Sequence, residues 1–368
     1  FEDRLFEYLK KIVNSKNYKN FNSAITNPDN IKGLSPQAPH RPIRAIKVYD
    51  GFINSVQLLN AIDEILTKKK NITICDDVVK KINYKRNLRE ILTEKTKFKC
   101  SQIVLANGAY AQKIVNKLPD LKNNTPKLFF GAGSAVILKS NNSRSKFEDE
   151  KETYPDLAIR TMDRGHACGL HLLPFKKHMY LGASSAVFSL PEPNPRSNQI
   201  AFMLNDAMNQ IGPVVGRASF ESYSFGFRPV SEDVFPLIGE TCLKNIWYLN
   251  GTKRDGLTMS PFICSELAKE ILNGKSKLPK EFIPSRKLIS YFNKRKAIEK
   301  TIIAKYNKEN THNMILPDSN DVKGHFNKLR ISIEKIYKKY QLKSFGLHPE
   351  LLSLYENNMI NKSLIKKR

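Results

Sequence analysis

The chain has 368 residues, with 61 basic and 35 acidic side chains and a hydrophobic share of 40%. These values describe a globular chain of about two to three domains and exclude a collagen, a coiled coil and disorder throughout. No apolar stretch approaches the roughly 20 residues of a membrane-spanning helix, so we expect no membrane span. The five cysteines are widely spaced and form no C-x-x-C pair, which favours reduced thiols and a cytoplasmic location.

The net charge of +26 raises the question of a nucleic-acid partner. Most of the basic residues are lysines, accompanied by abundant Asn and Ile, a bias that AT-rich coding produces on its own. Binding to phosphates requires clustered charge, which a bare total does not show. The one cluster covers residues 275–368, with 22 basic and 8 acidic residues. We therefore expect a basic C-terminal extension and regard a nucleic-acid partner as the weaker hypothesis.

The first 74 residues contain two predicted helices. The chain opens with Phe1 in place of Met, inside an amphipathic run, which indicates a fragment or a processed product. A proline-rich loop over 27–42 follows, and then a short strand at 46–48. Ser55 is the predicted cap of a second helix, whose apolar face comprises Val56, Leu59, Ile62, Ile65 and Leu66.

Strands dominate the middle of the sequence. Short strands are expected at 72–74, 78–82 and 90–93, and the run 103–106, apolar on both faces, suits a buried parallel strand. From 127 to 227 short alternating strands around one helix at 199–211 predict an antiparallel sheet.

Helices dominate the C-terminal part of the sequence. We expect a helix over 261–272 and a helical tail docked through Ile333, Ile336 and Tyr337.

Three segments in a fixed order carry the functional signal. The strand ending at Ala106 runs into Asn107-Gly108-Ala109-Tyr110, where a glycine lets a ligand approach the backbone. Much later, Gly226-Phe-Arg228-Pro229 precedes Phe235-Pro-Leu-Ile-Gly239. The third segment, Gly251-Thr-Lys-Arg-Asp-Gly256, opens a helix.

Taken together, these segments resemble the D-amino-acid-oxidase-like superfamily of FAD-dependent oxidoreductases, most closely its glycine-oxidase and sarcosine-oxidase branch. The resemblance covers roughly residues 48–275. It implies a small amine or amino-acid substrate and FAD as the cofactor, while the electron acceptor cannot be read. In that family the loop of the last motif presents backbone N–H groups to the flavin ring, and a helix start can stabilise negative charge there.

The resemblance also implies the site residues. Arg228 would grip a substrate carboxylate through its guanidinium fork, with a tie between two loops as the structural alternative. Arg254 would act beside it, with a salt bridge to Asp255 or Glu266 as its alternative, and His171 would line the pocket. The residues implied to contact the cofactor are Val79, Ala106, Gly108, Gly251, Thr252, Lys253, Arg254, Asp255, Gly256, Leu257 and Thr258.

One family element is absent from the given sequence. The N-terminal strand-turn-helix with G-x-G-x-x-G, which holds the FAD pyrophosphate, would lie before Phe1, so we expect this fragment to bind FAD poorly and to be inactive. Gly131-Ala-Gly133 imitates that fingerprint. We reject it because the third glycine is missing and the following residues continue a strand.

Two further readings are weaker. His166, Cys168 and His171 suggest a metal, but strand alternation puts 171 on the face opposite to 166 and 168, so no metal site is expected. Tyr223, Phe225 and Phe227 alternate on one strand, which usually means core packing, and only Tyr223 is considered for a pocket contact.

The expected fold is mixed α/β (α+β): a Rossmann-like FAD-binding domain lacking its first βαβ unit, an antiparallel substrate domain and a helical tail. The expected segments are 1–46 as helix and loop, 47–118 and 228–275 as the incomplete FAD-binding domain, 119–227 as the substrate domain, and 276–368 as the extension. The expected function is oxidation of a C–N bond by hydride transfer to flavin N5. Two alternatives stay open: a flavoenzyme acting on a carboxymethylamine of a tRNA base, and a flavin-free remnant that serves as a binding module.

Overall fold

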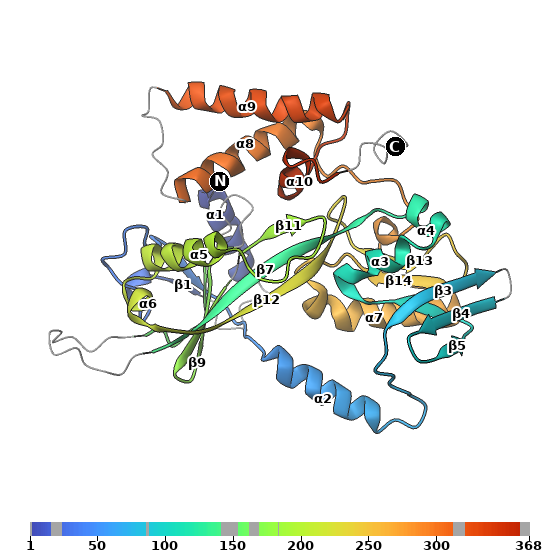
Figure 1. Ribbon diagram of the computed structural model, residues 1–368. Helices are drawn as coiled ribbons and strands as arrows, with labels where there is room; N and C mark the ends of the chain where they lie inside the picture. Colours follow the sequence, from blue (N-terminus) through green and yellow to red (C-terminus); the bar gives the residue numbers. More distant parts are fainter. Residues whose placement is uncertain are drawn as a thin grey trace. The chain divides into compact units, whose positions relative to one another are not determined.

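The computed structural model describes residues 2–15, 24–85, 88–140, 154–161, 169–182, 184–311 and 321–360. The chain divides into two compact units, each described here by itself. The first unit comprises Phe1–Ile74, Ser134–Ser184 and Pro195–Phe225, and the second comprises Cys75–Gly133, Ser185–Asn194 and Gly226–Arg368. Figure 1 shows the elements of both. The domain boundaries expected from the sequence remain a prediction.

An antiparallel sheet forms the core of the first unit. The end of β7 (Leu128–Lys139) pairs with β10 (His178–Gly182), which pairs with β9 (His171–Phe175), and β9 pairs with β8 (Ile159–Arg160). The helices α5 (Ser197–Gln210) and α6 (Val214–Arg217) pack on it through a shared apolar cluster. The smaller elements are α1 (Glu2–Val13), η2 (Pro28–Asn30), and the antiparallel pair of β1 (Ala24–Thr26) and β2 (Ala45–Lys47).

The helix α2 (Ser55–Thr67) forms as expected, with two differences. Its cap is Asn54, whose side chain accepts the N–H groups of Val56 and Gln57, one residue before the predicted cap. None of its residues is buried, and the apolar side chains Val56, Leu59 and Ile65 are more than half exposed. The apolar stripe that predicted the helix is therefore not covered within the described residues of this unit.

The second unit is built on a parallel strand pair. The strand β6 (Ile103–Leu105) pairs in parallel with β14 (Ile246–Asn250), which pairs antiparallel with β13 (Leu237–Glu240). This confirms the predicted parallel strand, although Val104 on one face of β6 is 44% exposed. The pair packs on α3 (Ala111–Val115) and α4 (Pro119–Asn124) through one cluster that contains Ile103, Leu105 and Tyr248, and η3 (Gly108–Tyr110) leads into α3.

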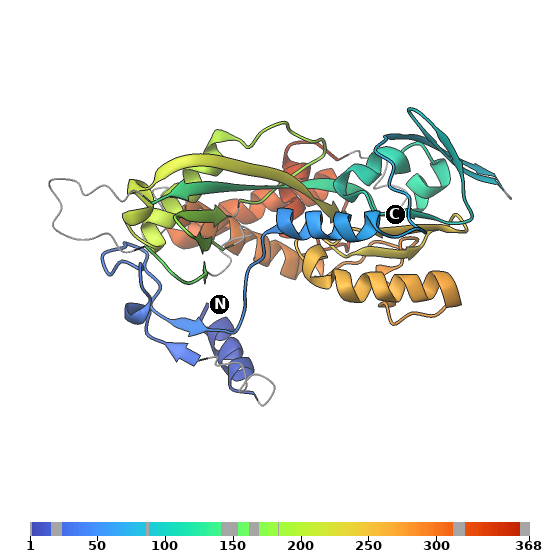
Figure 2. The same ribbon diagram turned by 90° about the horizontal axis from the view of Figure 1, so that it is seen from below.

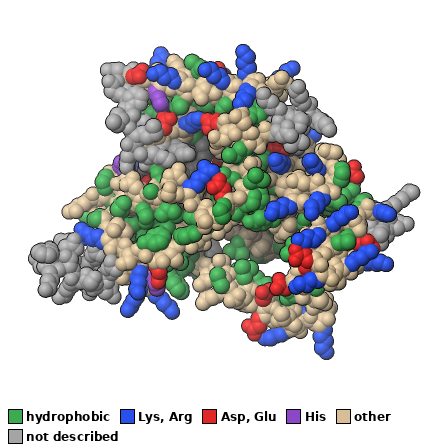
Figure 3. Space-filling model, viewed as in Figure 1, with side chains coloured by type: hydrophobic (Ala, Val, Ile, Leu, Met, Phe, Trp, Pro, Cys, Tyr) green, Lys and Arg blue, Asp and Glu red, His purple; other side chains and the backbone are tan. Residues whose placement is uncertain are grey.

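A separate antiparallel sheet carries several basic side chains. It consists of β3 (Val79–Lys85), β4 (Leu88–Thr93) and β5 (Lys97–Lys99), whereas the strand expected at 72–74 does not form. Figure 3 shows Lys and Arg side chains over this sheet. Lys80 and Lys97 form ion pairs with Glu94 and Glu90, so part of this charge is locally balanced.

The helix α7 (Gly256–Asn273) begins five residues earlier than predicted, with Pro261 inside it. A proline cannot donate to the carbonyl four residues before it, which here is that of Leu257. The Ser260 hydroxyl donates to this carbonyl at 2.7 Å and replaces the lost hydrogen bond. Ile263 and Leu267 of α7 pack on Ile238 and Trp247 of the sheet, so the helix lies against β13 and β14 (Figure 2).

The C-terminal extension is helical in its described part. It contains η4 (Lys280–Phe282), α8 (Lys294–Thr311), α9 (Val322–Lys339), η5 (Pro349–Leu351) and α10 (Leu352–Glu356). The predicted burial of Ile333, Ile336 and Tyr337 is confirmed. These side chains share a core cluster with Phe129 and Val230, so the extension completes the core of the second unit.

Two long strands place the first arginine motif. The start of β7 pairs with β11 (Ala186–Phe188), and β12 (Ser219–Ser231) also pairs with β7. Residues 128–139 form one uninterrupted strand. The rejection of Gly131-Ala-Gly133 as a dinucleotide fingerprint is therefore confirmed.

Candidate active site

An Asn-Gly dipeptide lies at the carboxyl end of each of the parallel strands β6 and β14. Asn107-Gly108 follows β6, and Asn250-Gly251 closes β14. Both glycines lie three positions after the last residue of the parallel pairing, which joins Leu105 to Tyr248, and adopt left-handed backbone angles, φ +60° and +71°. A Cβ added to Gly108 would meet no atom within 4 Å. Because parallel strands end at one edge of a sheet, these turns form a joint edge where ligands of α/β proteins bind.

Asn250 adds a buried polar group at this edge. Its side chain is buried, and its Oδ1 accepts the N–H of Gly251 at 3.1 Å. Its Nδ2 has no hydrogen-bond partner among the described residues. A buried donor without an acceptor costs free energy unless a ligand or water supplies one.

The loop after Gly251 is held tightly before α7 begins. A Cβ on Gly256 would lie 2.6 Å from Thr252 Oγ1, so a larger residue would not fit there without a shift. The N–H of Asp255 donates to the Thr252 carbonyl at 3.0 Å. Lys253 takes a left-handed backbone angle, φ +52°, and its N–H donates to the Pro229 carbonyl at 3.1 Å. This last bond ties the two arginine-bearing motifs together.

Arg228 lies over glycines of β7. A Cβ on Gly133 would come within 2.3–2.4 Å of the Arg228 guanidinium, and one on Gly131 would lie 2.6 Å from Val230 Cγ2. The guanidinium also faces the Ala132 carbonyl, with Nη1 3.5 Å from the oxygen. Gly131 and Gly133, which imitate a dinucleotide fingerprint in the sequence, therefore allow residues of β12 to lie close to the backbone of β7. A glycine inside a strand can indicate such a close approach.

An aromatic cluster occupies the opposite face of this strand pair. The rings of Phe130 and Phe227 meet edge to face at 5.4 Å, and Tyr110 contacts both, at 5.4 and 6.3 Å. Tyr110 stays 44% exposed, and Lys113 lies over its ring. Phe227 is half-buried in this cluster, whereas Tyr223 on the same strand is 48% exposed, so the core packing expected along the strand does not extend to Tyr223. The cluster places Tyr110 just after the Gly108 turn.

The charged residues of the loop find their counter-ion in the extension. Glu350 of η5 has a side chain only 5% exposed, with Oε2 2.5 Å from Lys253 Nζ and Oε1 3.6 Å from Arg254 Nη2. Burial is the largest single influence and opposes ionisation of Glu350, but the charge and hydrogen bond of Lys253, with smaller contributions from His348 and Arg254, together lower the pKa of this carboxyl. Burial lowers the pKa of the neighbouring His348 to about 4. Neither Glu350 nor His348 stands out in the sequence, because both follow a loop with no motif.

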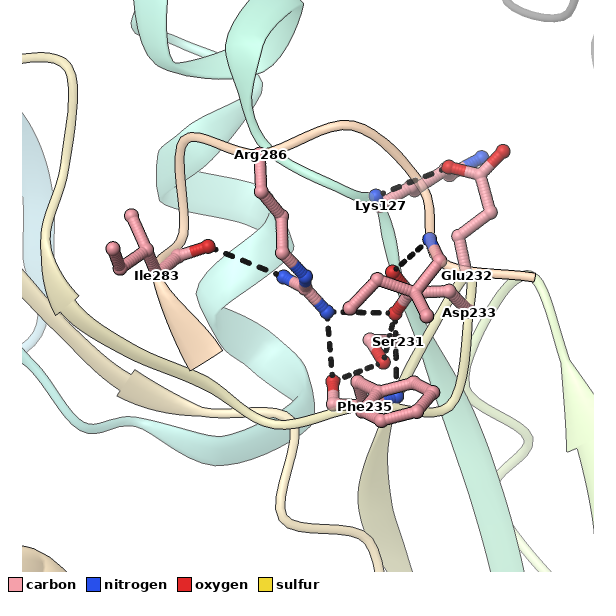
Figure 4. A network of polar contacts seen from close by, with 8 residues as sticks. Lys127, Ser231, Glu232, Asp233, Phe235, Ile283 and Arg286 are labelled. Atoms are coloured by element: carbon pink, nitrogen blue, oxygen red, sulfur yellow. Dashed lines mark hydrogen bonds and ion pairs between the residues drawn. The ribbon is translucent and has the colours of Figure 1, made fainter. Parts of the chain in front are cut away.

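A second polar network anchors the extension near the first arginine motif. Arg286 Nη2 donates to Asp233 Oδ1 at 2.9 Å, and the backbone N–H groups of Phe235 and Ile289 also donate to this carboxylate. Ser231 Oγ donates to the Phe235 carbonyl at 2.6 Å. Figure 4 shows these side chains pointing toward one another. The network fixes the turn between β12 and β13.

The remaining predicted site residues lie in different units of the chain. His171 starts β9 in the first unit, whereas Arg228, Arg254 and Gly256 lie in the second, so their convergence stays a prediction. Val79 is half-buried against the core around the parallel strands. His166 and Cys168 lie outside the described residues, and within those that are described no group of three or more His, Cys, Asp or Glu could hold a metal.

Comparison with known proteins identifies the family. The family model described as FAD dependent oxidoreductase (DAO) matches residues 2–270, and the chain belongs to this family, whose cofactor is FAD. The fold prediction, a mixed α/β chain of antiparallel sheets and helices like that of FAD-binding relatives, is confirmed. The extension from residue 271 onward lies beyond the match.

Individual relatives point in the same direction. A D-amino acid dehydrogenase of Vibrio atlanticus (strain LGP32) is 25% identical over 188 residues, which are 51% of this chain and 41% of that protein. The chain thus matches less than half the length of this curated relative. Glycine oxidase from Geobacillus kaustophilus has a similar fold, with a TM-score of 0.59, 15% identity, and 73% and 68% of the two chains covered.

Iminodiacetate oxidase from Chelativorans sp. BNC1 is similar in fold as well, with a TM-score of 0.61, 19% identity, and 77% and 72% coverage. At these identities the two structures support the fold alone. In the described part of the chain no helix combines the length and hydropathy needed to cross a membrane.

The residues at the sheet edge fit FAD. The open space before Gly108, the left-handed Gly251 and the unpaired Asn250 amide lie at the carboxyl ends of the parallel strands. Dinucleotides bind at this edge of such sheets. The loop 251–256 and the first turn of α7 add N–H groups and positive charge beside it.

Proposed function

We propose that this protein oxidises the C–N bond of a small amine or amino acid. FAD, when bound, would supply the hydride acceptor for the substrate carbon that bears the amine, and water would hydrolyse the resulting imine. The residues of this chain bind and orient the substrate, because a hydride transfer depends mainly on the placement of the two reacting centres. The electron acceptor that completes the cycle is left open.

Arg228 is the proposed carboxylate-binding residue. Its guanidinium lies over Gly133, which has no side chain to block it. A planar guanidinium can bind both oxygens of a carboxylate, which fixes the orientation as well as the position of an amino acid. His171 is proposed to line the pocket, as the family pattern implies.

The loop 251–256 is proposed to face the flavin ring. The positive end of α7 follows it directly, and helix starts stabilise negative charge. Residues Gly251 to Thr258 would then contact the cofactor together with Val79, Ala106 and Gly108.

One observation carries this assignment within the second unit. The N–H of Lys253 donates to the Pro229 carbonyl at 3.1 Å. Pro229 directly follows Arg228, so the proposed carboxylate-binding residue and the proposed flavin-facing loop are fixed to each other by one backbone hydrogen bond. This supports a site in which a carboxylate-bearing substrate and FAD are bound side by side.

The experiment is a comparison of substrates by their products. The protein expressed from its complete coding sequence is assayed with glycine, N-methylglycine and several D-amino acids, and with the same amines lacking the carboxylate. Formation of ammonia or methylamine with the matching oxo acid, slowed when the α-hydrogen is replaced by deuterium, supports the proposal. Turnover without an isotope effect and without an amine product contradicts it. The hypotheses of a tRNA substrate and of a flavin-free binding module stay as predictions.

A further inference from the structure

The C-terminal extension places one carboxylate beside the loop 251–256. Residues beyond 270 lie outside the family match, yet η5 brings Glu350 to Lys253 and Arg254, about 100 positions earlier in the chain. All three residues belong to the second unit. The family motif itself therefore does not account for this contact.

The contact is a largely desolvated ion cluster. The Glu350 side chain is 5% exposed, while those of Lys253 and Arg254 are 17% and 27% exposed. Ion pairs removed from water interact more strongly than surface pairs, and the loss of one partner leaves the other buried and uncompensated. Burial together with Lys253 and Arg254 also disfavours the charged form of His348 next to it. His348 caps η5 by accepting the Glu350 N–H at 3.3 Å.

The loop has an internal reason to need such support. Lys253 is a non-glycine residue with φ +52°. Left-handed backbone is strained for any residue with a Cβ, and it persists only where surrounding contacts hold it. The Lys253 side chain is held by Glu350 and its N–H by Pro229.

We propose that Glu350 is a positioning residue of the active site: it holds the conformation of the loop 251–256 and offsets the positive charge of Lys253 and Arg254. The effect of Glu350 on the loop conformation does not depend on a bound cofactor. Only the expected effect on the flavin rests on the proposed function.

Hydrogen exchange of the cofactor-free full chain tests the first part. Glu350→Gln keeps the shape of the side chain and removes its charge, and Glu356→Gln is the matched control, because Glu356 pairs with Lys305 in the same extension. We expect the Lys253 and Asp255 amides to exchange about tenfold faster in Glu350→Gln, as expected when a local opening becomes easier, and to be unchanged in Glu356→Gln. Unchanged exchange in both variants overturns the proposal.

A double-mutant cycle keeps the test decisive if Glu350→Gln folds poorly. Lys253→Met, Glu350→Gln and the double variant are compared by denaturant unfolding. Since Lys253→Met leaves Glu350 buried with one cation fewer, the double variant should be more stable than the sum of the single effects predicts. Additive effects contradict the claim that the two residues act on each other.

The flavin readout separates this inference from the proposed function. In the FAD-loaded protein, Glu350→Gln removes a negative charge near the ring, so we expect reduced flavin to gain about tenfold in relative affinity, a rise of about 30 mV for a two-electron couple. Faster amide exchange in the loop with an unchanged flavin potential would support the role of Glu350 in holding the loop and refute the placement of the flavin beside it. Unchanged amide exchange refutes the role of Glu350, whatever the flavin potential does.

Discussion

The Asp233 carboxylate and the Arg286 guanidinium form a buried ion pair across 53 positions of sequence. Nη2 and Oδ1 are 2.9 Å apart, and the side chains are 0% and 9% exposed. Asp233 belongs to the turn after the first arginine motif, and Arg286 belongs to the extension. The pair therefore joins the family-matched part of the second unit to the segment that follows it.

Breaking this pair should destabilise the second unit strongly. Arg286→Met leaves the Asp233 charge buried without its cation, for which the expected loss is about 3–5 kcal/mol. The measurement is denaturant unfolding followed by tryptophan fluorescence, since the single tryptophan, Trp247, is buried in this unit. Arg295→Met, at an exposed pair with Glu299, is the control. Equal effects of the two substitutions would show that the buried pair is not an anchor.

Gly131 and Gly133 should respond differently to alanine. A Cβ at Gly131 would meet Val230 and lie 3.1 Å from the Arg228 carbonyl, so Gly131→Ala should cost about 1–3 kcal/mol of stability, as overpacking does. At Gly133 the atom in the way is the end of the flexible Arg228 side chain. Gly133→Ala should therefore displace the guanidinium and raise KM for a carboxylate substrate with a smaller loss of stability. A larger loss of stability in Gly133→Ala than in Gly131→Ala, with KM raised only in Gly131→Ala, would refute this arrangement of Arg228 and Val230 over the two glycines.

His348 should make stability depend on pH. Its pKa is about 4 in the fold against an ordinary 6.5, because it is buried. As the pH falls from 6.5 toward 4, the unfolded chain binds a proton that the folded chain does not, so stability decreases by up to about 3 kcal/mol. Unfolding is measured between pH 5 and 7, above the range where the lowered pKa of Glu350 matters.

The matched variants isolate this histidine. His348→Asn keeps an acceptor at the start of η5 and should flatten the pH dependence, since Asn also serves as a cap. His40→Asn, at an exposed position, should leave it as it is. If the free energy of unfolding of His348→Asn still depends on pH as in the unchanged protein, other groups cause the pH dependence.

Arg228 should determine the preference for carboxylates. Arg228→Ala is expected to lower kcat/KM for a carboxylate-bearing substrate by the equivalent of about 2 to 4 kcal/mol, as when one partner of a desolvated charge pair is removed. The FAD content should stay unchanged, and an amine without a carboxylate should lose far less. Loss of FAD with unchanged selectivity would make Arg228 a structural residue and remove the amino-acid part of the proposal.

The sequence predicted what local patterns determine. The parallel strand β6, the uninterrupted strand over 128–138 and the buried face of α9 all follow from hydrophobic periodicity. The start of α7 was predicted wrongly, because a proline is typical of the first turn of a helix and Pro261 therefore indicates a start at that position. In the structure the Ser260 hydroxyl replaces the hydrogen bond that Pro261 cannot make, so the helix begins earlier. Gly131 and Gly133 were interpreted only against a fingerprint, and their role requires knowing that β12 lies beside β7.

Glu350 shows the other limit of sequence analysis. A lone glutamate in a basic tail carries no motif, and its contact with Lys253 depends on how the extension folds back across the second unit. Arg254 was expected to act on substrate or to pair with Asp255 or Glu266. It lies 3.6 Å from Glu350, and Glu266 instead pairs with Lys269 at 2.5 Å. Long-range charge pairing of this kind cannot be read from spacing.

The most direct test of the proposed function is an anaerobic visible spectrum of the FAD-loaded protein, expressed from its complete coding sequence, during titration with amino acids. The proposal predicts that at least one small amine or amino acid bleaches the flavin absorbance, with one equivalent of carbonyl product and of ammonia or released amine per flavin. Flavin that dithionite bleaches but no amine does, or protein that binds no flavin, would contradict it.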